Sequence, residues 1–370
     1  MAEQPAESVT KSTRDLETLR HQLALWLAKV LPDGADPQVP SVTMSESNGM
    51  SSETVLFEAM WTEDGQEKLG DFVARVAPDP ADVPVFPEYD FELQAGVMRL
   101  VAENSDVPVP NVRWIELDHD HVGQQFFVMD RIEGRVPPDV MPYNFGDSWL
   151  FHASREDQRA LQDASVEVVA KLHAIDLSAI DTSFLEFDVP GDTHLRRHLA
   201  NQRKYYDWAR EGMVVPIVER TFDWLEANWP EDEGDTVLSW GDSRIGNMMY
   251  DGFTPVAVLD WEMAGLGPRG IDLAWMIFLH DFFEGLCKRF EFPGMPHFMK
   301  ADDVAAKYTE ITGVEVADLY WFQVYAALRH AVVSVRTERR RIHFDEVPFP
   351  DDLDDLIMHR AQLEEMLANG

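Results

Sequence analysis

The chain has 370 residues and is 45% hydrophobic, enough for one large domain or two ordinary ones with a sizeable core. Its 31 Lys and Arg residues against 67 Asp and Glu residues give a formal charge of -36, which disfavours binding to nucleic acid or to an anionic membrane. One cysteine, Cys287, excludes an internal disulfide bond and fits a reducing compartment. Residues 1–14 are polar, unlike a signal peptide, and no apolar run has the length of a transmembrane helix, so we expect a cytoplasmic protein.

The N-terminal part begins with residues 1–15, which are rich in Ala, Glu, Ser and Thr and are expected to be mobile. Apolar residues then recur at helical spacing and predict a helix over residues 16–31, with Asp15 as its N-terminal cap. Three strand-like runs follow at 39–44, 53–61 and 69–76. This order predicts a helix followed by a small sheet.

Two features of these strands suit a ligand that carries phosphate. The loop at residues 45–52 includes Ser47 and Asn48 and is made mostly of small residues. Such a loop can bring backbone N–H groups close to phosphates, although most loops of this kind are plain turns. Arg75 lies on the third strand, where its planar guanidinium can make two contacts with a phosphate; the alternative is a solvated strand arginine.

A proline-rich linker at 78–87 precedes a helix that we predict over residues 88–103. Glu88 and Glu92 lie four residues apart and therefore on one face of this helix. Either carboxylate can pair with a basic residue of the sheet. Two further strands are predicted at 112–116 and 125–129.

The rest of the chain has mostly helical periodicity. Helices are predicted at 157–175, 194–210, 215–228, 271–290, 301–313, 316–340 and 351–368. Side chains at helical spacing on them are expected in the core: His173, Trp208, Trp224, Trp275, Trp321 and Tyr325. The main basic cluster, formed by Arg336, Arg339, Arg340 and Arg341, is expected at a solvated helix end, with contact to an anionic substrate as the alternative.

Between these helices lies a set of three polar residues with a regular spacing. Asp242 follows a short apolar run, and Asn247 comes five residues later. Hydrophobic runs at 248–250 and 255–259 flank a turn and predict a hairpin that ends on a second carboxylate, Asp260. A single Asp or Asn in a loop usually bonds its own backbone, so the signal lies in the set as a whole.

Phosphoryl transfer needs such a set: one carboxylate to accept the proton of the attacking hydroxyl, and hard oxygen ligands for Mg²⁺. In protein kinases the catalytic-loop Asp is followed five residues later by Asn and, after a hairpin, by the Asp of Asp-Phe-Gly. Asp242, Asn247 and Asp260 have this order and spacing. We therefore predict that Asp242 is the base and that Asn247 and Asp260 hold Mg²⁺.

Gly241 before the base, and Asp260-Trp261-Glu262 in place of Asp-Phe-Gly, differ from protein kinases. They resemble the aminoglycoside phosphotransferase and choline-kinase-like family of small-molecule kinases. The resemblance extends to Gly267–Ala274, where that family carries a Pro-x-x-x-Asp-Leu-Ala-type segment that braces the catalytic loop. It departs at Trp240, where the family has His; because that residue mainly packs, no reactive group is lost.

The resemblance covers nearly the whole chain and implies a two-lobed protein-kinase-like α+β fold. A small β-rich, nucleotide-binding N-lobe is expected at residues 16–134 and a larger helical lobe, catalytic and substrate-binding, at 135–370. Mg²⁺ is implied as cofactor and ATP or GTP as co-substrate. Arg244, next to the base, is implied to touch the substrate or the γ-phosphate and is taken as catalytic together with Asp242.

For the nucleotide, the resemblance implies a contact between Arg75 and the phosphates, with Glu92 as its partner and Glu88 as the alternative. The loop with Ser47 and Asn48 is implied to cover the phosphates. Residues 127–134 resemble the kinase hinge, where one backbone C=O and one N–H read the adenine edge; the alternative is a buried strand that ends in a polar turn. The hinge residues implied are Met129, Asp130 and Ile132.

The Asp-x-Arg-x-Gly-Asn pattern at 242–247 resembles a subgroup found fused to, or working beside, acyl-CoA dehydrogenases. Hydroxyacyl compounds are implied as acceptors, and a cationic aminoglycoside is the alternative that the acidic composition favours. A nucleotide-binding pseudokinase that acts as sensor or scaffold is a second hypothesis, which the complete Asp/Asn/Asp set disfavours. A protein kinase is disfavoured because the chain lacks an Ala-Pro-Glu segment. Partners are thus expected to be nucleotide and small acceptor, with no nucleic acid or membrane, and the oligomeric state is open.

Overall fold

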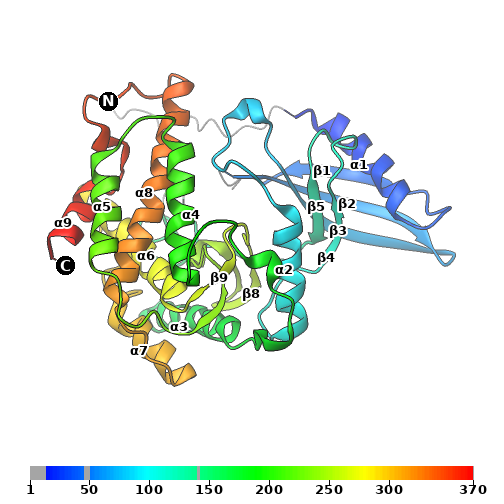
Figure 1. Cartoon of the computed structure of the whole chain (residues 1–370). Helices are drawn as coiled ribbons and strands as arrows, with labels where there is room; N and C mark the ends of the chain where they lie inside the picture. Colours follow the sequence, from blue (N-terminus) through cyan, green and yellow to red (C-terminus); the bar gives the residue numbers. More distant parts are fainter. Residues whose placement is uncertain (1–13, 46–50, 140–141, 370) are drawn as a thin grey trace. The chain divides into compact units, whose positions relative to one another are not determined.

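The computed structural model describes residues 14–45, 51–139 and 142–369. The chain divides into two compact units. The N-terminal unit holds the residues up to 95 together with 110–131, and the C-terminal unit holds 96–109 together with the residues from 132 onward. The first is built around an antiparallel sheet and the second is mostly helical (Figure 1). The predicted loop residues Ser47 and Asn48, and nearly all of the N-terminal segment expected to be mobile, lie outside the described residues.

The sheet of the N-terminal unit has the strand order β1-β2-β3-β5-β4, and all its neighbours are antiparallel. Its strands are β1 (Gln38–Met44), β2 (Glu53–Glu63), β3 (Gln66–Val76), β4 (Val112–Glu116) and β5 (Phe126–Asp130). These bounds agree closely with the sequence prediction. The register places Arg75 opposite Thr54 of β2 and Phe127 of β5.

Helix α1 (Leu16–Val30) packs against this sheet because one of its faces is apolar. Asp15 accepts a hydrogen bond from Thr18 N at 2.8 Å, which confirms the predicted cap. The buried face, which includes Trp26, joins a core that contains Phe72 and Phe126. A fully buried side chain of this size contributes about 1.5–3 kcal/mol to stability.

The predicted helix at 88–103 begins later than expected. Helix α2 spans Phe91–Asn104, after the 3₁₀ turn η1 (Pro80–Asp82). Asp90 accepts a hydrogen bond from Leu93 N at 2.8 Å and so acts as the N-terminal cap. Glu88 therefore lies before the helix, and the prediction that it shares a helical face with Glu92 was wrong.

The C-terminal unit is built on helices α3 (Arg155–His173), α4 (His194–Ala209), α5 (Pro216–Ala227), α6 (Gly270–Arg289), α7 (Ala301–Thr312), α8 (Leu319–His343) and α9 (Arg360–Asn369). Short 3₁₀ turns lie at η2 (Leu177–Ala179), η3 (Ser183–Leu185) and η5 (Leu353–Leu356). Helix α6 is buried over most of its length, and α8 packs on α4, α5 and α6 (Figure 1). None of the helices in the described ranges is both long and apolar enough to cross a membrane.

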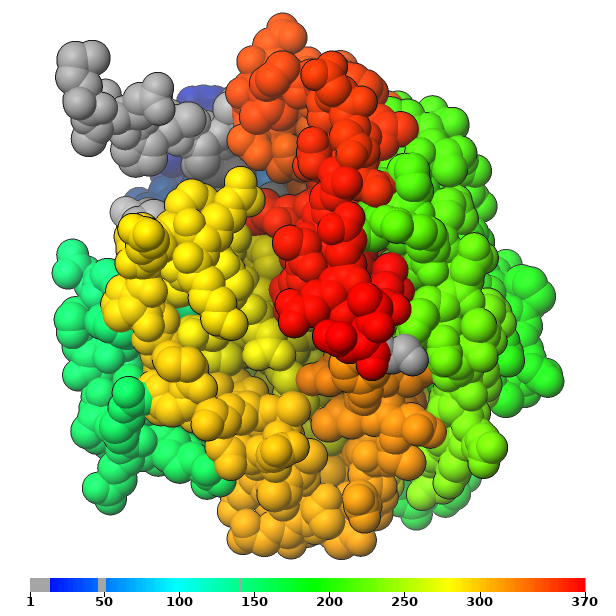
Figure 2. Space-filling model, turned by 90° about the vertical axis from the view of Figure 1, so that its left-hand side faces the viewer, coloured from blue at the N-terminus to red at the C-terminus, as the bar shows by residue number. Residues whose placement is uncertain are grey.

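Two details of these helices differ from the sequence prediction. The helix predicted at 351–368 is interrupted, because buried Asp354 of η5 caps α5 by accepting Ile217 N at 2.8 Å, and α9 starts at Arg360. The C-terminal segment (red) lies against α5 (green) on the face drawn in Figure 2. Arg336 was expected at a solvated helix end, but it is buried and pairs with Glu211.

Two small antiparallel sheets complete the C-terminal unit: β6 (Thr236–Ser239) with β9 (Gly265–Pro268), and β7 (Met248–Asp251) with β8 (Thr254–Val258). The second pair is the predicted hairpin. Strand β9 was not predicted, because Gly-Leu-Gly-Pro has no strand propensity of its own and depends on pairing with β6.

Candidate active site

The candidate site is built on the loop that follows β6, where the chain turns sharply at Gly241. Its φ of 87° lies in the left-handed region, and a Cβ added there would be 2.0 Å from Met263 O. Only glycine fits both conditions. The turn brings Asp242 to the start of the 3₁₀ turn η4 (Ile245–Asn247), which leads directly into β7.

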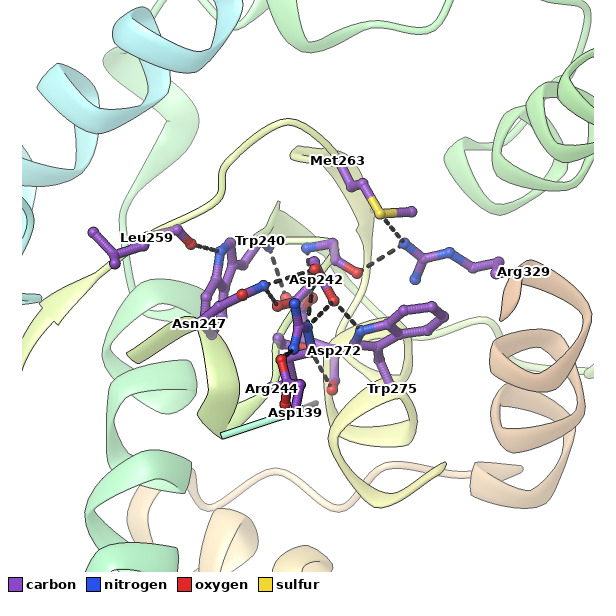
Figure 3. A network of polar contacts seen from close by, with 12 residues as sticks. Asp139, Trp240, Asp242, Arg244, Asn247, Leu259, Met263, Asp272, Trp275 and Arg329 are labelled. Carbon is purple, nitrogen blue, oxygen red and sulfur yellow. Dashed lines mark hydrogen bonds and ion pairs between the residues drawn. The ribbon is translucent and has the colours of Figure 1, made fainter. Parts of the chain in front are cut away.

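The loop is held from behind by the carboxylate of Asp272 on α6, which is fully buried. Oδ1 accepts Gly241 N at 2.8 Å and Ser239 Oγ at 3.0 Å, and Oδ2 accepts Trp240 N at 2.9 Å. Ser243 Oγ donates to the backbone oxygen of Asp272 at 2.7 Å. Asp272 therefore braces the loop that carries Asp242, as the resemblance implied for its segment (Figure 3).

A second layer of polar groups supports Asp272. His173 Nε2 lies 2.9 Å from Asp272 Oδ2, and its Nδ1 lies 2.8 Å from the hydroxyl of Tyr308 on α7. Burial alone raises the pKa of Asp272, but the bonds from His173, Gly241 and Trp240 outweigh it and hold the pKa below its usual value. Asp272 is therefore an ionised brace, and His173 is a buried core residue, as predicted.

Asp242 is buried, and both of its carboxylate oxygens accept hydrogen bonds. Oδ1 accepts Trp275 Nε1 at 2.5 Å, Oδ2 accepts Asn247 Nδ2 at 2.6 Å, and Arg244 Nε lies 3.2 Å from each oxygen. Burial, together with the charge of Asp260, raises the pKa of Asp242 to about 7, although the donors Trp275 and Asn247 oppose this shift. A general base works best with a pKa near the working pH.

Arg244 joins Asp242 to a residue that the sequence prediction did not include. Its Nη1 forms an ion pair with Asp139, while its Nε lies beside Asp242. A Cβ at Gly246 would lie 2.4 Å from Asp139 Oδ1 and 2.7 Å from Arg244 Nη1, so the pair needs glycine there. The structure thus brings the two predicted catalytic residues, Asp242 and Arg244, into direct contact (Figure 3).

The two predicted metal ligands suit a magnesium ion in their chemistry. The Asn247 amide donates its Nδ2 to Asp242, which leaves its oxygen as the atom that can bind a cation. Leu259 N donates to Asn247 O at 2.9 Å, so Asp260 follows directly after a residue bonded to Asn247. Across the described ranges no three His, Cys, Asp or Glu side chains form a metal cluster.

Trp240, which replaces the family His, is a packing residue. It is 0% exposed, and its ring lies 5.7 Å from that of Trp261. Its indole N–H donates to Leu259 O at 2.9 Å. The bond satisfies the buried indole donor, and it links the loop that carries Asp242 to the residue before Asp260.

Replacement of Trp240 by Ala should lower stability by about 3–5 kcal/mol, because a buried Trp leaves a large cavity. It should also lower activity, since the loop that carries Asp242 loses its support. Trp240→His should be much milder. The measurements are chemical denaturation and acceptor kinetics on both variants. An unchanged free energy of unfolding with a raised acceptor KM in Trp240→Ala would instead indicate that the ring stacks on the substrate.

The described residues among those predicted to bind nucleotide lie on β3, on α2, and in or just after β5. Arg75 Nη1 donates to Thr54 Oγ1 at 2.9 Å, and Glu92 lies in the first turn of α2. The pairing of Arg75 with Glu92 stays a prediction. Met129 is buried in β5, and Asp130 at its end accepts Arg113 Nε at 2.6 Å. Ile132 follows two residues after Asp130.

Three residues at the site escaped the sequence prediction: Asp139, Trp275 and Arg329. Trp275 was assigned to the core by its helical spacing, and it is buried, but its N–H is also bonded to Asp242. Arg329 lies on α8, and its Nη2 donates to Gly241 O at 2.7 Å. No local sequence pattern predicts Asp139 or Arg329, because both residues contact the site only through tertiary packing.

The chain matches a family model and several known proteins. The model of the phosphotransferase enzyme family (APH) matches residues 47–296. Acyl-CoA dehydrogenase family member 11 of Gallus gallus is 27% identical over 280 residues, which cover 74% of this chain and 32% of that protein. Acyl-CoA dehydrogenase family member 10 of Mus musculus is 29% identical over 210 residues, which cover 56% of this chain and 18% of that protein. The chain thus spans a third or less of these relatives.

Solved structures show the same fold. A candidate aminoglycoside phosphotransferase of Ralstonia eutropha aligns with a TM-score of 0.65 at 21% identity, over 94% of this chain and 97% of that one. Macrolide 2'-phosphotransferase MphH of Brachybacterium faecium aligns with a TM-score of 0.55 at 18% identity, over 91% and 97%. The fold is therefore the expected two-lobed protein-kinase-like α+β fold. Since the family model matches more than half of the chain, this protein belongs to the phosphotransferase enzyme family.

Proposed function

We propose that the chain transfers the γ-phosphoryl group of ATP or GTP to a hydroxyl of a small molecule in a Mg²⁺-dependent reaction. The observation that carries the proposal is the buried carboxylate of Asp242. It accepts a hydrogen bond from Asn247, and the charge of Asp260 helps to raise its pKa. These three groups are the ones that phosphoryl transfer requires. Family membership supports small-molecule phosphotransfer.

Asp242 accepts the proton of the acceptor hydroxyl as the new O–P bond forms. The bond between the γ-phosphorus and the bridging oxygen breaks at the same time, and the nucleoside diphosphate leaves with the electron pair. Arg244, held by Asp139 and Asp242, supplies positive charge beside the transferring group. Fixed groups of this kind need no reorganisation during the reaction, so catalysis is positioning plus charge stabilisation.

Asn247 and Asp260 would hold Mg²⁺. When bound, the ion neutralises phosphate charge and orients the β- and γ-oxygens. Asp260 has a φ of 62°, in the left-handed region, which Asp adopts more readily than most residues with a side chain. A related structure, aminoglycoside phosphotransferase APH(4)-Ia, was solved as a ternary complex with AMP-PNP and hygromycin B, which supports an adenine nucleotide here.

For the nucleotide we propose that Arg75, paired with Glu92, contacts the phosphates. The loop with Ser47 and Asn48 would cover them, and the hinge residues would read the base: Met129, Asp130 and Ile132. This part of the proposal rests on the resemblance. The acceptor is a hydroxylated small molecule. Hydroxyacyl compounds are the class that the resemblance implies, and two relatives are named acyl-CoA dehydrogenase family members; aminoglycosides are the alternative.

Asp260→Ala should remove Mg²⁺-dependent nucleotide binding, and Asn247→Ala should weaken it, because the cation is the largest local charge in such a site. The measurement is calorimetric affinity for ATP with and without Mg²⁺. Asp251→Ala is the matched control, since Asp251 is an exposed carboxylate on the same hairpin. Equal Mg-ATP affinity in Asp260→Ala and wild type at saturating Mg²⁺ would count against the assignment.

A screen for ADP production tests the function itself. Wild type is incubated with Mg-ATP and three sets of acceptors: hydroxyacyl-CoA thioesters, aminoglycosides and other hydroxylated metabolites. The proposal predicts acceptor-dependent ADP release. Nucleotide binding without ADP release for any acceptor would favour the pseudokinase hypothesis.

A further inference from the structure

We propose that Trp275 and Arg329 form a positioning pair that fixes the carboxylate of Asp242 for proton acceptance. Neither residue lies on the catalytic loop or the hairpin: Trp275 comes from α6 and Arg329 from α8. The inference rests on the proposed function and adds two residues to its machinery. Both act through Asp242 and are therefore positioning residues.

Trp275 fixes one oxygen of the base. The indole is 4% exposed, and its N–H donates to Asp242 Oδ1 at 2.5 Å, a short contact for an N–H donor. Asn247 binds the other oxygen at 2.6 Å. Arg244 Nε lies 3.2 Å from each oxygen as well, and these donors together fix the plane of the carboxylate.

Arg329 is a buried cation without a full set of partners. It is 2% exposed, and its Nη2 donates to Gly241 O at 2.7 Å. In the described part of the chain, its Nε and Nη1 have no hydrogen-bond partner. Burying a guanidinium with unsatisfied donors is unfavourable for stability. A role at the site explains why the position carries Arg rather than an apolar residue.

The two residues are joined by a cation–π contact. The guanidinium carbon of Arg329 lies 4.4 Å from the centroid of a Trp275 ring. A cation over the face of an indole withdraws electron density from it, which makes the N–H a stronger donor to Asp242. Arg329 thereby acts on both sides of the base, through the Gly241 carbonyl before it and through the indole beside it (Figure 3).

The first test is Trp275→Phe, which keeps an aromatic ring under Arg329 and removes the N–H. The expected result is a loss in kcat of about 10²-fold for ADP release from Mg-ATP, measured with the hydroxylated acceptor that gives most ADP in the screen. KM for Mg-ATP should stay unchanged, because Trp275 is placed against the base and not against the nucleotide. The matched control is Trp321→Phe: Trp321 is buried on α8, and its N–H donates to Leu225 O at 3.0 Å. That variant should lose stability and keep its kcat.

The second test concerns Arg329. Arg329→Met should lower kcat, while Arg329→Lys should recover part of it, since the charge over the indole returns. Arg336→Met is the matched control, because Arg336 is a buried arginine of the same helix, 4.2 Å from the ring of Trp208. Its loss should change stability alone.

An indole N–H NMR spectrum adds a readout that needs no turnover. The Trp275 signal, assigned by its loss in Trp275→Phe, should lie downfield of the other indole signals. It should move upfield in Arg329→Met and in Asp242→Asn. A merely structural role for Arg329 would leave it in place.

The inference is overturned if wild type turns over Mg-ATP and Trp275→Phe has the same kcat, or if the Trp275 signal is unmoved in Arg329→Met. Wild type that releases no ADP from Mg-ATP with any acceptor of the screen would overturn the proposed function and, with it, the catalytic role of the pair. The two failures are thus distinguishable.

Discussion

Asp242→Asn is expected to lower kcat for phosphoryl transfer by about 10²- to 10⁴-fold, the range that a positioned general base supplies. An amide cannot accept the acceptor proton. The new amide nitrogen is itself a donor. It would face the N–H of Trp275 or of Asn247, because both donate to the native carboxylate. The affinity for Mg-nucleotide should stay nearly unchanged, so the loss appears in kcat.

The measurement combines ADP formation, calorimetry and thermal unfolding. Asp251→Asn, at an exposed carboxylate of the hairpin, is the control and should match wild type in all three. Near-normal turnover by Asp242→Asn would remove Asp242 from the role of base.

The second large effect is expected for Asp272→Asn. One amide oxygen can still accept Ser239 and Gly241, but the amide nitrogen must face the donors of Trp240 and His173. Each buried donor left without an acceptor costs about 1–3 kcal/mol, so the variant should lose about 2–6 kcal/mol of unfolding free energy. Activity should fall with it, because the catalytic loop loses its brace.

Denaturant unfolding and ADP formation measure both effects. The control is Asp354→Asn, which alters a buried carboxylate that accepts Ile217 N at the start of α5. It should lose stability without a specific loss of activity in the folded protein. A stable and fully active Asp272→Asn variant would show that the brace is dispensable.

The hairpin and its polar residues could be predicted from sequence because their signal is local. Asp242, Asn247 and Asp260 lie within twenty residues of chain, and the strands between them carry their own apolar pattern. Asp272 was found through the resemblance. The helices α1 and α3 were predicted by periodicity, and α1 also by its cap at Asp15, which again are local features.

What the sequence did not reveal depends on packing between distant segments. Trp275 looked like an ordinary core residue, since its ring is buried and only the direction of its N–H distinguishes it. Arg329 meets Gly241 because α8 packs on α6, a contact without a sequence pattern. Strand β9 exists only through its partner β6, and the early start of α2 was excluded by a cap at Asp90.

The most direct test of the central claim is to follow a label in the γ-phosphoryl group of ATP. Wild type, Asp242→Asn and Asp260→Ala are incubated with Mg²⁺, labelled ATP and the acceptor that gives most ADP in the screen. The account predicts that the label appears on the acceptor as a phosphate ester with wild type, and that both variants transfer almost none. Label that stays in ATP with wild type, or that reaches the acceptor equally with Asp242→Asn, would contradict it.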